Sequence, residues 1–256
     1  MSYTVEALQD ALGVLRVVAH DPGLGVSEIS RRAGFTKART FRFLATFEEA
    51  GIVQRGRDGI SYNLGPAALV IGLAAQEQVS LTRLAEKHLD ALVAKFNESA
   101  VVLVRDGMES VSVAQKNSSH EVRVHGAIGR RRPLHAGASG KVLLAFGPAD
   151  IENRMLDGEL PKVAPQTITS KTKLKKELQR TREQGYASSL SEGAVDVVAI
   201  AAPVYGSAGL VVASIGLSMP SSRAPEDLSG MARVICEAAR QLSTDLGWEP
   251  DATVQR

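Results

Sequence analysis

The stretch from residue 26 to residue 52, VSEISRRAGFTKARTFRFLATFEEAGI, constrains the fold of this chain most strongly. Its pattern predicts two helices joined by a tight turn. Ser27 begins the first helix, Gly34 ends it, and Thr36 caps the second helix, which we expect to reach Ala50. One stripe of the second helix is predicted to be buried, at the spacing i, i+3, i+4 and i+7: Thr40, Phe43, Leu44 and Phe47.

The opposite side of the second helix has a composition that suits the major groove of DNA. Its N-terminal half exposes small, aromatic and cationic side chains: Lys37, Ala38, Arg39, Phe41 and Arg42. From residue 26 to residue 57 the chain has seven basic and three acidic residues, a local net charge of +4, whereas the whole chain has only +2. Phosphate binding requires this kind of local clustering. A solvated helix pair in an ordinary helical domain is the alternative interpretation.

The flanking segments extend this pattern. Residues 5–19 form an amphipathic helix whose buried side is predicted to contain Leu8, Leu12, Leu15 and either Val18 or Ala19. Residues 52–55 and 60–64 are predicted strands, and Asp58-Gly59 between them is a strong hairpin signal. Three helices followed by a hairpin is the order of a winged helix-turn-helix. We expect Arg55 and Arg57 at the hairpin tip to contact DNA phosphates rather than only solvent.

Gly65-Pro66 begins a helix whose first part, AALVIGLAA, is apolar on all sides. Such a helix must be buried all round, and this one is too short to cross a bilayer. We therefore predict a linker that packs against the first helix and against its own copy in a second subunit. The alternative is a core helix of one larger domain.

Beyond residue 80 the pattern predicts an α+β domain with an antiparallel sheet. Its expected helices are residues 81–96, 139–146, 148–156, 174–184 and 225–246, and its expected strands are residues 101–105, 110–114, 121–125, 186–190, 195–205 and 210–219. The predicted domains are a DNA-binding domain, a linker and dimerisation helix, an effector-binding domain and a tail: residues 1–65, 66–80, 81–247 and 248–256. Without a signal pattern or an apolar run of about 18 residues, we expect a cytoplasmic protein.

Several sequence blocks resemble the isocitrate lyase regulator (IclR) family of transcriptional regulators. They are GFTKARTFRFLATFEEAGIV, YNLGP, GRRRPLHAGASGKVLLAF, the TITS to EQGYA stretch and SEGAVDVVAIAAPV, in that order. The resemblance implies an N-terminal winged-helix DNA reader, a C-terminal GAF-like effector domain, and homodimers that often pair into tetramers on an operator. The chain departs from the family at Ala38-Arg39, where many members have Ser-Thr, and at Ser189, where many have an acidic residue.

Residues 137–140, GASG, are small and begin a helix, so their backbone N–H groups and the helix dipole favour an anion. The resemblance implies that a small organic acid binds there. Its predicted contacts are Ala138 and Ser139 at the helix start, Ser189 and Glu192 as polar groups opposite, and an apolar wall of Val124, Leu134, Val197, Ala199 and Ile215. Such walls admit an aromatic or a short aliphatic acid. A tight turn of small residues packed for shape is the alternative.

Enzymatic and metal-dependent interpretations fit poorly. GASGK lacks the first glycine of a phosphate loop, where His135 stands, and Val142 replaces its Ser or Thr. A hydrolase using Ser139 and His135 would lack the G-x-S-x-G pattern. His120, His125, His135 and Glu192 match no known metal-site spacing, and the single Cys236 is expected to fill a core. We expect a ligand-responsive DNA-binding regulator with no cofactor, whose partners are double-stranded operator DNA and a small organic acid.

Overall fold

The computed structural model describes residues 4–78 and 80–250. The chain divides into two compact units, residues 1–79 and residues 80–256, each with its own core. Most of the predicted tail, residues 251–256, lies outside the described residues. None of the helices in the described part is both long enough and apolar enough to span a membrane.

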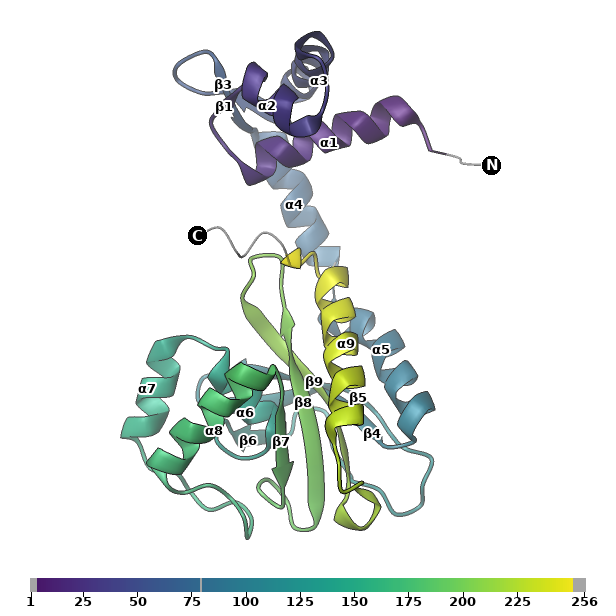
Figure 1. The fold of residues 1–256 in the computed structure, drawn as a ribbon, viewed down its shortest axis with the longest axis vertical. Coiled ribbons are helices and arrows are strands. Elements are labelled where there is room, and N and C mark those ends of the chain that lie inside the picture. Colours follow the sequence, from purple (N-terminus) through teal and green to yellow (C-terminus); the bar gives the residue numbers. More distant parts are fainter. Residues whose placement is uncertain (1–3, 79, 251–256) are drawn as a thin grey trace. The chain divides into compact units, whose positions relative to one another are not determined.

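The N-terminal unit has the predicted order of three helices and a hairpin, followed by a fourth helix (Figure 1). Its three strands form an antiparallel sheet in the order β1-β3-β2. Its elements are α1 (Glu6–His20), β1 (Leu24–Gly25), α2 (Val26–Ala33), α3 (Lys37–Glu49), β2 (Val53–Arg55), β3 (Ser61–Leu64) and α4 (Pro66–Gln78). The predicted winged helix-turn-helix fold is therefore confirmed.

The predicted signals act as expected around α3. Gly34 ends α2 with a left-handed φ of 75°, a conformation that glycine adopts without strain. The Thr36 hydroxyl caps α3 by accepting a hydrogen bond from the Arg39 backbone N–H at 3.3 Å. Thr40 and Leu44 are fully buried, and the two phenylalanines of the stripe pack against the same core.

The buried side of α1 differs in part from the prediction. Leu8 and Leu12 are 58% and 46% exposed, and the helix buries Ala11 and Val14 in their place, whereas Val18 is buried and Leu15 packs against the core as predicted. Both sides of α1 contain apolar residues, and the periodicity favours the side with the larger side chains, Leu8 and Leu12. The smaller side chains face the core because α1 packs closely against α2 and α3.

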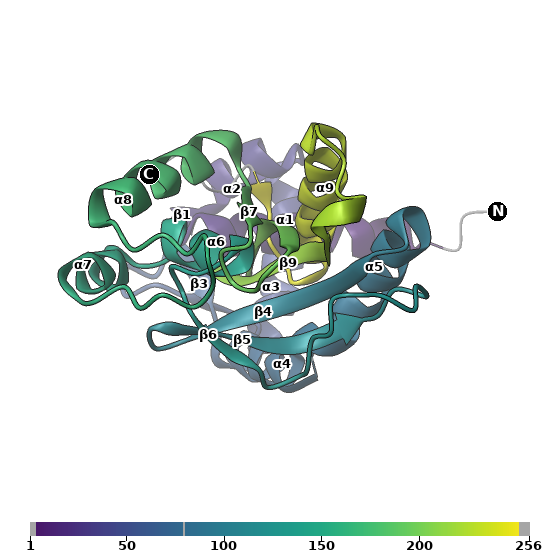
Figure 2. The same ribbon diagram turned by 90° about the horizontal axis from the view of Figure 1, so that it is seen from below.

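The C-terminal unit is built on a six-stranded antiparallel sheet in the order β6-β5-β4-β9-β8-β7. Helices α5 and α9 pack against each other and against one face of this sheet, while α6 packs on the other face with α7 and α8 beside it (Figure 2). Its elements are α5 (Leu81–Phe96), β4 (Ser99–Asp106), β5 (Glu109–Lys116), β6 (Arg131–Pro133), α6 (Ala138–Ala145), α7 (Ala149–Asp157), α8 (Lys171–Gln184), β7 (Ala187–Leu190), β8 (Val197–Tyr205), β9 (Val211–Pro220), a 3₁₀ turn (Ser221–Arg223) and α9 (Ser229–Asp245).

Alternation along the strands separates the two faces of the sheet. Along β8, Val198, Ile200 and Ala202 belong to the large core beneath α5 and α9. Ala199 and Ala201 between them pack in a smaller cluster with α6. Because successive side chains of a strand point to opposite faces, each position of the central strands is committed to one side.

The predicted strand at residues 121–125 is wrong. This segment is irregular, and β6 at Arg131–Pro133 is the strand that pairs with β5. The carbonyl groups of Val122 and Val124 accept hydrogen bonds from the side chains of Arg223 and Ser99 instead of from a neighbouring strand. The other predicted strands and helices of this unit are present, with ends shifted by a few residues.

Candidate functional site

The exposed side of α3 presents the side chains predicted to meet DNA. Lys37, Ala38, Phe41 and Arg42 are all exposed. Within residues 4–78 and 80–250, the side chains of Lys37 and Arg42 form no ion pair. The small Ala38 keeps the N-terminal part of this surface open for close approach of another molecule.

Arg39 has a different environment from its neighbours. Its guanidinium pairs with the Asp10 carboxylate of α1 at 2.5 Å and lies 5.2 Å from the ring centroid of Phe35 and 5.7 Å from that of Phe43. The ion pair therefore ties α3 to α1, while the two cation–π contacts hold the guanidinium against the turn before α3 and against α3 itself. The helical spacing predicts Arg39 among the DNA-facing cations, because no local pattern indicates its contact with Asp10, 29 positions away along the chain.

We expect Arg39→Ala to lower the free energy of unfolding of the N-terminal unit by about 1 kcal/mol, since an exposed ion pair and a cation–π contact each contribute up to about 1 kcal/mol. Urea unfolding followed by circular dichroism measures the loss. Asp10→Ala should cause part of it, and the two substitutions together should cost less than the sum of their separate effects. If the effects of the two substitutions on the free energy of unfolding were strictly additive, Arg39 and Asp10 would not be energetically coupled.

The wing hairpin holds its two arginines differently. Arg55 pairs with Glu48 of α3 at 3.0 Å, donates to the Gly59 carbonyl at 3.1 Å, and lies over the Tyr62 ring. Its hydrogen bond to Glu48 raises the pKa of Arg55. Arg57 is exposed and forms no ion pair with any described residue. Of these two arginines, only Arg57 can bind a phosphate without first breaking a contact.

Asp58 fixes the shape of the wing. Its Oδ1 accepts hydrogen bonds from the backbone N–H groups of Ile60 and Ser61 at 3.0 and 2.9 Å and from the Ser61 hydroxyl at 2.8 Å. These bonds lower the pKa of the Asp58 carboxyl, and the two bonds from Ser61 have the largest effect. The wing is therefore an ordered hairpin that holds the backbone of Arg57 in place.

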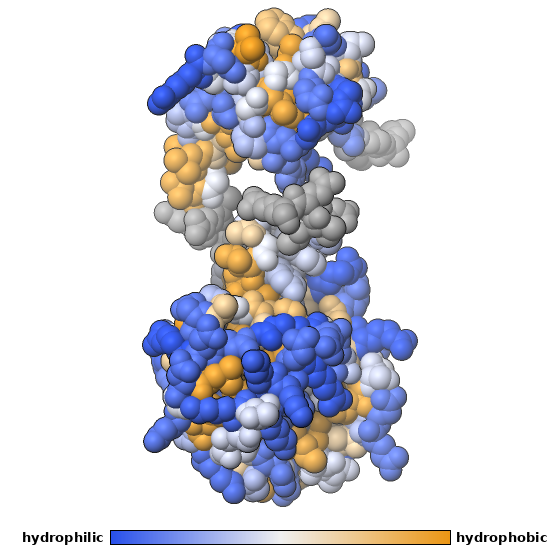
Figure 3. All heavy atoms as spheres, turned by 60° about the vertical axis from the view of Figure 1, so that its left-hand side comes forward, coloured by the Kyte–Doolittle hydropathy of each residue, from blue (hydrophilic) through white to orange (hydrophobic). Residues whose placement is uncertain are grey.

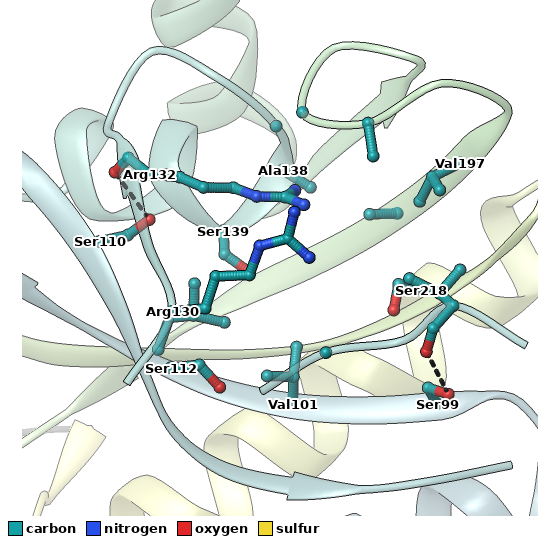
Figure 4. A pocket seen from close by; sticks show the side chains of 18 of the residues that line it. Ser99, Val101, Ser110, Ser112, Arg130, Arg132, Ala138, Ser139, Val197 and Ser218 are labelled. Carbon is teal, nitrogen blue, oxygen red and sulfur yellow. Dashed lines mark hydrogen bonds between the residues drawn. The ribbon is translucent and has the colours of Figure 1, made fainter. Parts of the chain in front are cut away.

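A cavity of about 110 Å³ lies in the C-terminal unit between the start of α6, the β7–β8 loop, the α6 face of the sheet and residues 124–132 (Figure 4). Six of the predicted effector residues line it: Val124, Ala138, Ser139, Ser189, Val197 and Ala199. The structure thus brings together the helix start and most of the predicted wall.

Three other predicted effector residues lie elsewhere. Ile215 belongs to the core under α5 and α9, because its strand parity directs it to the opposite face of the sheet. Leu134 is buried in the separate cluster that joins α6, α7 and α8. Glu192 forms an ion pair with Lys141 instead of facing the cavity.

The start of α6 is partly satisfied within the chain. The Ser189 hydroxyl accepts a hydrogen bond from the Ala138 backbone N–H at 3.2 Å, so Ser189 holds the helix end. A Cβ atom on Gly140 would lie 2.4 Å from the Leu134 carbonyl oxygen, which explains why glycine is needed there. Ser139 lines the cavity, and its hydroxyl has no hydrogen-bond partner among the described residues.

Sequence reasoning missed Arg130 and Arg132, both of which extend into the cavity (Figure 4). Burial, and secondarily the charge of Arg130, lowers the pKa of Arg132. Arg131 between them pairs with Asp106 and Glu109 outside the cavity. The alternation of a strand separates Arg131 from its neighbours, so placing a strand at residues 131–133 would have revealed the pair.

A buried ion pair joins Lys141, which follows the cavity-lining Gly140, to Glu192, which precedes the cavity-lining Gly193. The side chain of Lys141 is 1% exposed, and its Nζ lies 2.7 Å from Glu192 Oε1 and 2.8 Å from the Ser188 carbonyl oxygen. Glu177 is a more distant partner at 3.8 Å. Burial raises the pKa of Glu192, and the Lys141 charge opposes that shift. This pair joins α6 to the loop after β7.

The alternative chemistries gain no support. His135 Nε2 contacts the Pro161 carbonyl oxygen at 3.0 Å, and no hydrogen bond joins His135 to Ser139 in the described part of the chain. Among the described residues, no three His, Cys, Asp or Glu side chains gather in a way that could hold a metal ion. His120 instead lies against Asn97.

The chain is similar to known proteins over almost its whole length. Residues 7–57 match the family model described as the IclR helix-turn-helix domain, and residues 73–244 match that described as bacterial transcriptional regulator IclR C-terminal. The HTH-type transcriptional regulator KipR of Bacillus subtilis is 30% identical over 240 residues, covering 93% of this chain and 96% of KipR.

Solved structures share the same fold. The crystal structure of an IclR transcriptional regulator from a Silicibacter species has a TM-score of 0.86 at 24% identity, covering 96% of this chain and 97% of that one. An IclR homolog from Microbacterium hydrocarbonoxydans, crystallised with 4-hydroxybenzoate, has a TM-score of 0.60 at 26% identity, covering 94% and 99%. The names of these relatives describe transcriptional regulators rather than enzymes.

Proposed function

The chain belongs to the IclR family of bacterial transcriptional regulators, and on that premise we propose that it is a cytoplasmic homodimer whose affinity for operator DNA is controlled by a small organic acid. The exposed, unpaired cations of α3 and of the wing carry the DNA-binding part of the proposal. The cavity at the start of α6 carries the effector part.

The DNA-binding surface combines a helix end with a hairpin tip. Lys37, Ala38, Phe41 and Arg42 face the major groove in this proposal, and Arg57 contacts the phosphate backbone. Arg39 and Arg55 act indirectly, because their contacts with Asp10 and Glu48 fix α3 and the wing. Backbone-directed cations orient the protein, while the α3 side chains select the sequence.

The effector part rests on the cavity and on a relative. The cavity combines an apolar wall, including Val124, Val197 and Ala199, with a helix N-terminus and two arginines. The Microbacterium hydrocarbonoxydans homolog was crystallised with an organic acid, 4-hydroxybenzoate. An effector regulates DNA binding only to the extent that it binds one arrangement of the reading domains better than the other.

The dimer part rests on α4. Leu69, Val70, Ile71 and Leu73 are all more than half exposed in the single chain, so α4 has exposed hydrophobic surface, which Figure 3 colours orange. A helix that is apolar on all sides is normally buried, and exposed apolar patches of this kind mark protein interfaces. We propose that α4 pairs with α4 of a second subunit, and that dimers associate into tetramers on the operator.

We expect binding to duplex DNA to weaken steeply as salt rises, because cations that bind phosphates release condensed counterions. Arg57→Ala should reduce the slope of log affinity against log salt by about 1, because it removes a phosphate contact, and Arg42→Ala should weaken binding to the selected duplex by about 1–3 kcal/mol, because it removes a contact in the major groove. Fluorescence anisotropy with a labelled duplex, selected from a random library by the purified protein, measures the slope.

The matched control is Arg240→Ala, which removes an exposed arginine of α9 that pairs with Glu237. It should leave both the affinity and the slope unchanged. If Arg42→Ala and Arg57→Ala behaved like this control, the assigned DNA-binding surface would be wrong.

A further inference from the structure

We infer that the cavity at the start of α6 selects a small dianionic acid, a short aliphatic dicarboxylate, over monocarboxylates of the same size. This inference rests on the proposed function, since it assumes that the cavity holds the effector. The apolar wall alone admits an aromatic or a short aliphatic acid, and the inference narrows this class of ligands to short aliphatic acids with two negative charges. The charges inside the cavity are its first support.

Two guanidinium groups extend into this cavity, and none of the described residues that line it is acidic. Arg130 donates one hydrogen bond to the His125 carbonyl oxygen at 3.3 Å, and neither Arg130 nor Arg132 forms an ion pair with a described residue. Figure 4 shows both side chains extending into the cavity, and the positive charge of Arg130 contributes to lowering the pKa of Arg132, so the two guanidinium groups lie near each other. Two positive charges therefore meet without a carboxylate from the chain itself.

A ligand with a single negative charge would leave one of the two arginines without a counter-charge. Like charges that converge disfavour each other, and burial adds to the cost, as the lowered pKa of Arg132 indicates. A guanidinium binds a carboxylate best through two parallel hydrogen bonds, so two guanidinium groups offer more donors than one carboxylate can accept in good geometry. A ligand with two negative charges neutralises both arginines.

The remaining polar groups offer further hydrogen bonds to carboxylate oxygens. The first turn of α6 adds backbone N–H groups and the hydroxyl of Ser139. On the sheet side, the Ser112 hydroxyl is buried and has no hydrogen-bond partner among the described residues. A buried hydroxyl without a partner is costly unless a ligand or water satisfies it. The cavity thus has polar contacts besides the arginines.

The size of the cavity limits the ligand further. Its volume of about 110 Å³ is well below the ~300–1,000 Å³ of pockets that hold drug-sized molecules. A dicarboxylate with a short carbon chain brings two charges with few atoms. The apolar side chains of Val101 and Leu103, which also line the cavity, suit its methylene groups.

The test is isothermal titration calorimetry on the full chain with succinate, glutarate, their monoamides and 4-hydroxybenzoate. A monoamide matches its diacid in size and lacks one charge, so we expect at least one diacid to bind about tenfold or more tightly than its monoamide. Arg130→Gln and Arg132→Gln should abolish that preference. Arg131→Gln, the matched control in the same tripeptide, should retain it because Arg131 pairs outside the cavity.

Anisotropy with labelled DNA separates this inference from the proposed function. Each variant should keep the wild-type circular dichroism spectrum and thermal unfolding midpoint, which shows that the C-terminal unit is folded. If neither diacid binds, or if diacid and monoamide bind equally, the inference is overturned. If only 4-hydroxybenzoate binds and shifts DNA affinity, the proposed function stands and the inference falls. If a diacid binds preferentially without changing DNA affinity, the inference stands and the regulatory role fails.

Discussion

Replacing Lys141 by methionine is expected to lower the free energy of unfolding of the C-terminal unit by about 3–5 kcal/mol, the typical cost of removing one partner of a buried ion pair. Lys141 is almost inaccessible to solvent, and its Nζ holds both the Glu192 carboxylate and the Ser188 carbonyl group. Methionine preserves most of the volume and removes the charge. The substitution therefore leaves Glu192 as a buried carboxylate without its nearest cation.

The pH dependence of this destabilisation has a defined sign. Burial raises the pKa of Glu192 above its ordinary value of 4.5 in the folded state, and Lys141 opposes that shift. A carboxyl group with a raised pKa in the folded state favours folding when protonated, and this advantage is lost as pH rises through the folded pKa. Without Lys141 the pKa of Glu192 rises further, so the deficit of the variant should be smallest below pH 4.5 and larger at neutral pH. Urea unfolding of both proteins across this range measures it.

A double-mutant cycle provides the control. Lys141→Met combined with Glu192→Gln removes both charges, so it should recover a large part of the stability that the single variant loses. Unchanged stability of Lys141→Met would show that the pair contributes nothing. A double variant whose destabilisation equals the sum of the two single effects would show that the charges are not coupled.

The helix-turn-helix could be predicted because its signals are local. Gly34, the Thr36 cap and the Thr40–Leu44 spacing all act within a few residues of one another. The hairpin at Asp58-Gly59 was equally local, and its hydrogen bonds follow the residue types. These short-range features determine which surface of α3 faces outward.

Long-range pairing could not be predicted in this way. Asp10 and Arg39 meet only because α1 packs across α3, and no sequence spacing indicates that contact. Among the predicted cavity residues, the position along the strand determines which face of the sheet a side chain occupies. Ala199 lines the cavity, and Ile215 points to the other face. The sequence pattern does not reveal Arg130 and Arg132, because it predicts a strand at residues 121–125 and so places the arginine run in a loop.

Replacing Leu69 or Leu73 by glutamate is expected to convert the proposed dimer into monomers and to weaken operator binding by about 100-fold or more. The two side chains are one helical turn apart on α4 and are 65% and 52% exposed in the single chain. In the proposed dimer they lie against the same helix of the second subunit. A carboxylate there would be buried without a partner or would keep the helices apart.

Sedimentation velocity measures the association state, and anisotropy on the selected duplex measures affinity. The affinity falls because two linked reading domains bind one operator as a single unit, and that effective concentration disappears when the subunits separate. Leu210→Glu is the matched control, since Leu210 is similarly exposed but lies on the β8–β9 turn of the C-terminal unit. Dimers of the α4 variants would refute the proposed interface. Monomers that retain full operator affinity would refute bivalent recognition, because α4 would then join two subunits that do not read DNA together.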